Sequence, residues 1–126
     1  MLKRDEAFCG YSVDDVERAK AFYADVLGMD VLDAPMGALE ISIGGGKHVY
    51  VYPKDDHQPA TFTVFNIPTD DIDAAVVELG ARGVSFEHYE GFTGADGIAR
   101  GRAGGMGPDI AWFRDPAGNI CAVLQP

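Results

Sequence analysis

An internal repeat is the feature of this chain that most constrains its fold. The string Val13–Val16 returns in similar form as Thr69–Ile72, 56 residues later, and Ala19 matches Ala75 at the same offset. In both places the string follows an alternating apolar segment and opens a segment with apolar residues at helical spacing. The chain therefore contains two copies of one structural unit, and each copy has the order strand, helix and three strands.

The first module is expected at about residues 7–53. Its first strand covers Ala7–Val13, where Cys9, Tyr11 and Val13 alternate with residues of the opposite face. Asp14 is expected to cap the following helix, which Gly28 ends. Three short strands are then predicted near Val31, at Leu39–Ile43 and at His48–Tyr52.

The second module is expected at about residues 60–126. It begins with an alternating strand at Thr61–Ile67, and Pro68–Asp70 opens its helix. Strands are predicted at Val84–Tyr89, Ile110–Arg114 and Ile120–Leu124. The Gly-rich stretch Gly91–Pro108, here called the flap, is too long for a tight turn and is expected to be mobile.

Charge and cysteine content narrow the classes of partner. Twenty acidic and ten basic residues give a net charge of −10, which disfavours nucleic acid and anionic membrane surfaces. No apolar run reaches the roughly 18 residues that a spanning helix needs. Cys9 and Cys121 lie in apolar runs without a C-x-x-C spacing and are expected to be core thiols of a cytoplasmic protein.

Two strings carry a resemblance to a known family. They are Val13–Gly28 (VDDVERAKAFYADVLG) and Ile110–Asn119 (IAWFRDPAGN) before a final strand. In this order and spacing they resemble the vicinal oxygen chelate superfamily of glyoxalase I, bleomycin-resistance proteins and extradiol dioxygenases. The resemblance covers nearly the whole chain and implies a single α+β domain, residues 1–126. Its two βαβββ modules would form a curled mixed sheet, or cup, with the helices packed outside.

The resemblance also indicates where a metal would bind. Metal-using members of the family place His, Gln or Glu at four positions of the cup, and the matching positions here are Phe8, Tyr50, Phe62 and Ala122. Phenylalanine and alanine offer no lone pair, and tyrosine would have to lose a proton with a pKa near ~10. We therefore predict no metal ion and no other cofactor.

Strand alternation then predicts the lining of the cup. If Phe8, Tyr50 and Phe62 face it, Gly10, Ser12 and Asn66 share that face. The expected ligand-binding residues are Phe8, His48, Tyr50, Tyr52, Phe62, Val64, Trp112 and Ala122. Two alternatives stay open: the aromatic rings fill the interior and leave no cavity, or Trp112 faces the helices because its hairpin slips by one residue.

A few polar residues are weaker candidates for a role in catalysis or ligand binding. His48, beside Tyr50, and Glu40, opposite the apolar residues of its strand, are the candidate acid or base groups. His57 is expected to face solvent. Arg100 and Arg102 in the flap either meet an anionic ligand or keep the loop soluble.

The function predicted from these features is metal-independent binding of an aromatic or hydrophobic small molecule, similar to the drug-sequestering branch of the family. The alternative is a metal-free lyase or isomerase that uses His48 or Glu40, and a weaker one is an acidic scaffold for a protein partner. Because family members often dimerise, sometimes with exchanged modules, a homodimer is expected.

Overall fold

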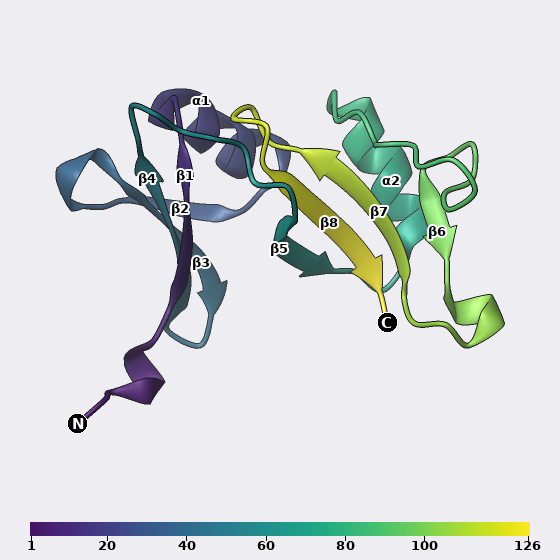
Figure 1. Cartoon of the computed structure of the whole chain (residues 1–126), viewed down its shortest axis with the longest axis horizontal. Coiled ribbons are helices and arrows are strands. Elements are labelled where there is room, and N and C mark those ends of the chain that lie inside the picture. Colours follow the sequence, from purple (N-terminus) through teal and green to yellow (C-terminus); the bar gives the residue numbers. More distant parts are fainter. The chain divides into compact units, whose positions relative to one another are not determined.

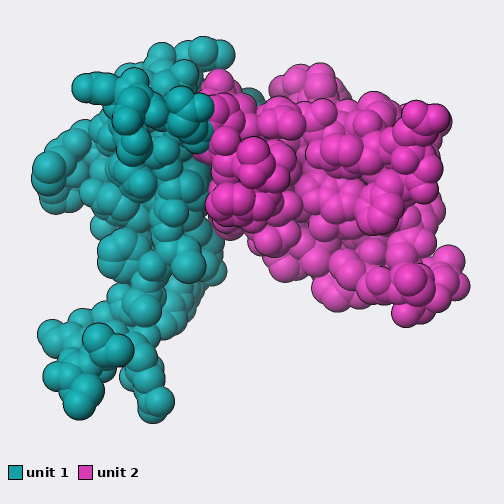
Figure 2. Space-filling view, viewed as in Figure 1, with its two compact units in different colours: residues 1–58 teal, residues 59–126 magenta.

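The computed structural model describes all 126 residues and divides the chain into two compact units, residues 1–58 and 59–126. Figure 1 labels the elements, and Figure 2 colours the first unit teal and the second magenta. Each unit has one four-stranded sheet in which the first and last strands of the unit pair in parallel and the other strands are antiparallel. The two βαβββ modules of an α+β fold are thereby confirmed.

The first unit has the strand order β1-β4-β3-β2. Its elements are β1 (Cys9–Val13), α1 (Val16–Ala21), β2 (Asp30–Asp33), β3 (Leu39–Gly44) and β4 (Lys47–Pro53). A five-residue π-helical turn, Phe22–Val26, continues α1, and short 3-10 turns cover Arg4–Glu6 and Pro35–Gly37. Gly28, with φ of 71°, then ends the helical segment as predicted.

The second unit has the order β5-β8-β7-β6. Its elements are β5 (Thr63–Pro68), α2 (Ile72–Ala81), β6 (Ile98–Arg100), β7 (Asp109–Arg114) and β8 (Ile120–Gln125), with a 3-10 turn at Arg102–Gly104. None of the helices in either unit reaches the length and apolarity that crossing a lipid bilayer requires.

The repeat extends to the helix caps, although each helix begins later than predicted. The Asp15 carboxylate accepts a hydrogen bond from the Arg18 amide at 3.1 Å, and the Asp71 carboxylate accepts one from the Ala74 amide at 3.1 Å. Each aspartate therefore satisfies one of the free N–H groups at a helix start. The predicted cap, Asp14, stands one residue before the cap that the structure has, Asp15.

The prediction of a strand at Val84–Tyr89 was wrong. Only Phe86 forms an isolated bridge, to Phe113, and the edge strand β6 instead lies inside the flap. The chain turns away at Tyr89, whose carbonyl accepts hydrogen bonds from the amides of Phe92 and Thr93 at 2.9 Å. This turn ends the extended segment before it can pair further along β7.

The core of each unit lies between its helix and one face of its sheet. In the first unit, alternate residues of β1, β3 and β4 are buried, and the Tyr11 hydroxyl donates to the Tyr23 hydroxyl of the helical segment at 2.7 Å. In the second unit the cluster comprises Ile72, Ile98, Ala111 and Val123. Neither cysteine forms a disulfide; Cys121 is buried and Cys9 is exposed, so the expectation of two core thiols holds only for Cys121.

Gly10 permits the close approach of β1 to β4. It pairs with Tyr50, and a Cβ atom at position 10 would lie 2.6 Å from the Tyr50 carbonyl oxygen. That separation is far below van der Waals contact, so a side chain here would push the two parallel strands apart.

Candidate functional site

In the first unit, aromatic side chains line the sheet face opposite the core. Because Tyr11, Val49 and Val51 are buried on the core side, the alternating residues of β1 and β4 occupy the other face. We call the row of Phe8, His48, Tyr50 and Tyr52 the aromatic face. The Phe8 ring lies 5.0 Å from the His48 ring and 5.9 Å from the Tyr50 ring, and Tyr50 stacks on Tyr52 at 6.0 Å.

Glu40 stands beside this row. It is the register partner of Tyr50 on β3, and its Oε1 lies 3.9 Å from Nε2 of His48. A cavity of about 190 Å³ opens here, lined by Leu32, Glu40, Ser42, Gly46, Lys47 and His48. The two candidate acid or base residues are thus neighbours, with a separation longer than a direct hydrogen bond.

In the second unit, Trp112 lines a pocket on the face opposite the core. Its neighbours Ala111 and Phe113 are fully buried, which places Trp112 on the other face of β7 and answers the question left open by the sequence. The indole lies 5.5 Å from the Tyr89 ring and 5.8 Å from the Phe92 ring. The pocket has a volume of about 330 Å³ and is lined by Thr61, Phe62, Thr63, Tyr89, Phe92, Trp112 and Ile120.

The remaining predicted residues of this unit have different surroundings. Phe62 lines the pocket and is 67% exposed, whereas Ala122 is fully buried opposite Trp112. Val64 is half-buried and lies outside the pocket lining, because the pairing of β5 with β8 is irregular between Thr63 and Phe65.

Comparison with known proteins assigns this architecture to a family. The model of the Glyoxalase/Bleomycin resistance protein/Dioxygenase superfamily matches residues 7–123, nearly the whole chain. The chain belongs to this superfamily. No curated protein sequence matches it at a significant level.

Solved structures of the superfamily share its fold. TnmS3, an antibiotic binding protein from Streptomyces sp. CB03234, is 26% identical, with 94% of this chain and 93% of that chain covered and a TM-score of 0.68. A superfamily member from Sphaerobacter thermophilus DSM 20745 is 25% identical, with 94% of each chain covered and a TM-score of 0.68. Lactoylglutathione lyase from Agrobacterium tumefaciens, at 21% identity, covers 94% of this chain and 90% of its own, with a TM-score of 0.64, and shows the fold alone.

The superfamily's metal-ligand positions do not supply a ligand set here. Of Phe8, Tyr50, Phe62 and Ala122, only the tyrosine carries a donor atom, and a phenol must lose its proton to bind a cation well. Elsewhere in the chain, no group of three or more His, Cys, Asp or Glu side chains is arranged to hold a metal ion. The residues at these positions therefore do not fit the metal ion that the metal-using members of the superfamily bind.

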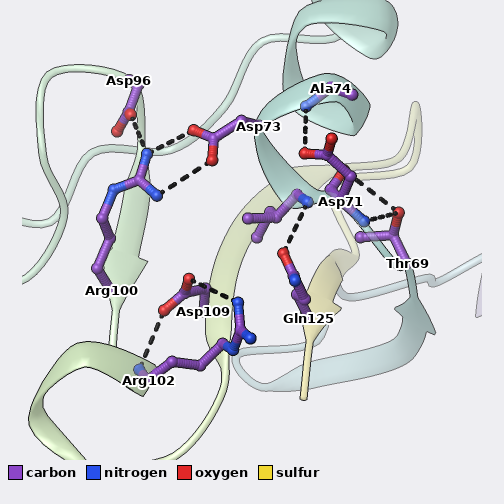
Figure 3. A network of polar contacts seen from close by, with 10 residues as sticks. Thr69, Asp71, Asp73, Ala74, Asp96, Arg100, Arg102, Asp109 and Gln125 are labelled. Atoms are coloured by element: carbon purple, nitrogen blue, oxygen red, sulfur yellow. Dashed lines mark hydrogen bonds and ion pairs between the residues drawn. The ribbon is translucent and has the colours of Figure 1, made fainter.

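Arg100 forms one ion pair that joins the flap to α2 and a second inside the flap (Figure 3). The Arg100 guanidinium lies 2.6 Å from the Asp73 carboxylate of α2 and 3.0 Å from that of Asp96. The hydrogen bond and charge of Arg100 lower the pKa of Asp73, and the hydrogen bond from the Ile98 amide, together with Arg100, lowers the pKa of Asp96. Arg100 thus forms ion pairs within its own unit. The sequence had suggested either contact with an anionic ligand or a role in loop solubility, and neither interpretation included these pairs.

Two further features of the site were missed by sequence reasoning. His57, expected to face solvent, is half-buried, and its Nδ1 lies 2.7 Å from the Ser12 hydroxyl. Tyr89 and Phe92 line the Trp112 pocket, although Tyr89 ends the segment that was predicted to be a strand and Phe92 stands at the start of the flap. Phe92 could have been recognised as a large aromatic residue in a Gly-rich stretch, where a solvated loop would have small polar residues.

Proposed function

We propose that this chain is a metal-independent protein that binds an aromatic or hydrophobic small molecule. The observation that carries the proposal is the pocket beside Trp112, which is open to solvent and lined by four aromatic side chains and no charged one. Concave apolar surfaces with a few hydroxyl groups are typical of small-molecule sites. The likeness to TnmS3, described as an antibiotic binding protein, supports the same class of function.

Stacking is the interaction that such a ligand would use. Each well-placed aromatic pair contributes about 0.5–1.5 kcal/mol beyond the burial of apolar area. Phe62 and Phe92 are 67% and 65% exposed, so their rings retain surface that a planar molecule can cover. The aromatic face of the first unit offers a second surface of the same kind. We also propose a homodimer located in the cytoplasm.

The chain's single tryptophan makes the proposal directly testable. Titration with neutral planar compounds such as anthraquinones should quench Trp112 emission saturably, and chromatography with mass spectrometry should recover the compound unchanged. Phe62→Ala and Phe92→Ala should each weaken binding about tenfold, equal to 1.4 kcal/mol. Val77→Ala, an exposed change on α2 outside the pocket, is the control. Equal affinities in all four proteins would contradict the proposal.

A metal-free lyase or isomerase is the second candidate, favoured by the 3.9 Å approach of His48 to Glu40 beside the aromatic face. Histidine and glutamate are residue types that commonly move protons in catalysis. An enzyme would convert the bound compound, and His48→Ala or Glu40→Ala would abolish turnover while binding survives. Recovery of unchanged compound from every protein decides for binding alone.

A further inference from the structure

We propose that the aromatic face of the first unit prefers planar cations and that Glu40 determines this preference. The inference rests on the proposed function, because it requires that a planar molecule binds at all. It adds the charge of the ligand and names the residue that selects it.

The placement of Glu40 is the first support. Glu40 stands on β3 directly across from Tyr50, and its side chain is 38% exposed, so the carboxylate remains accessible beside the ring. The carboxylate of Glu40 can therefore contact a cation that lies over the Tyr50 ring. Its ion-pair partner is the His48 imidazole at 3.9 Å, which is charged only when protonated.

The electrostatics of the neighbouring rings act in the same direction. The faces of aromatic rings carry negative partial charge and attract cations within about 6 Å of the ring centre. A carboxylate beside two stacked tyrosines therefore adds to a potential that is already negative, in a chain of net charge −10. Lys47 also lines the cavity that Glu40 and His48 border. Its Nζ is directed toward the Asp5 carbonyl, to which it donates a hydrogen bond at 2.9 Å.

The second unit provides a contrast within the same chain. No charged side chain lines the Trp112 pocket, so no carboxylate there adds to the attraction of a cation. Charge selection should therefore be stronger in the first unit, and Glu40 should account for the difference.

Two isosteric probes test the inference. N-methylquinolinium and 1-methylnaphthalene have nearly the same shape and differ in charge. Binding at the aromatic face is followed by NMR shifts of the His48 ring protons, because the only tryptophan lies in the other unit. The cation should bind the unmodified chain about five- to tenfold more tightly than the neutral probe. Glu40→Gln should reduce that preference to the smaller one that the rings alone provide and leave the affinity for 1-methylnaphthalene unchanged.

Glu17→Gln is the matched control, because it removes the same charge from an exposed position on α1, away from this sheet face. Retention of the preference in this variant supports the inference. Equal binding of the two probes to the unmodified chain overturns the inference. An equal loss of the preference for the cation in Glu40→Gln and Glu17→Gln overturns it too. Both outcomes leave the proposed function standing. If neither probe shifts the His48 protons while Trp112 is still quenched, only the inference fails. If Trp112 is not quenched either, the proposed function fails as well.

Discussion

Asp115 is the residue on which the turn between β7 and β8 depends. Its Oδ1 accepts hydrogen bonds from the amides of Ala117 at 3.0 Å and Asn119 at 2.8 Å, and all three residues are buried. The Asn119 side chain donates to the other carboxylate oxygen at 3.3 Å and accepts from the Ala60 amide at 3.2 Å. Through Asn119 the carboxylate thus connects the turn to the irregular segment before β5.

Replacing this carboxylate should destabilise the protein strongly. Asp115→Ala leaves two buried amides without an acceptor, so the free energy of unfolding, measured in urea, should fall by about 3 kcal/mol. Asp115→Asn keeps one acceptor oxygen and should lose less than half as much. Unchanged stability in both variants would show that the turn satisfies these amides without the side chain.

The flap is the element whose stability should depend on pH. Both Asp73 and Asp96 have pKa values below their ordinary value of 3.8. A group whose folded pKa is depressed contributes stability above its unfolded pKa, and the contribution is lost as pH falls through the folded value. The ties between Arg100 and these carboxylates should therefore persist at neutral pH and weaken below about pH 3.8.

Hydrogen exchange of the β6 amides measures this loss. The protection factors of β6 should fall several-fold between pH 5 and pH 3 in the unmodified chain. In Arg100→Gln they should already be lower at pH 5 and change less. Arg82→Gln breaks an exposed pair with Glu78 on α2 and serves as the control. A β6 segment equally protected in Arg100→Gln at pH 5 would contradict a role for these ion pairs.

The sequence predicted most elements because the repeat has a physical basis in both copies. Alternating burial marked the strands, and both helices begin at an aspartate cap of the same motif. β6 was missed because its three residues stand between glycines and show no periodicity long enough to detect. This segment is a strand because it pairs with β7, and its own residue pattern does not indicate one.

The candidate site was predictable where it depends on alternation and not where it depends on loops. Phe8, His48, Tyr50 and Tyr52 lie on one face because residues of adjacent strands stay in register. Tyr89 and Phe92 contact Trp112 because the chain turns between them, and hydrophobic periodicity does not predict such a turn.

At the scale of the whole molecule, stability should not depend on a metal ion. Removal of metals by chelation, followed by addition of zinc, nickel or manganese, should leave the thermal midpoint unchanged. A cation bound at a hundred times its dissociation constant would add about 2.7 kcal/mol. Elemental analysis that finds one cation per chain after purification without chelator would refute metal independence.

The bare position at Gly10 limits how this protein can diversify. No side chain of β1 stands across from Tyr50, and the parallel strands approach too closely to admit one. A side chain added there would both cover the Tyr50 ring and push the two paired strands apart. Substitutions that alter this sheet face are therefore confined to the positions that flank Gly10.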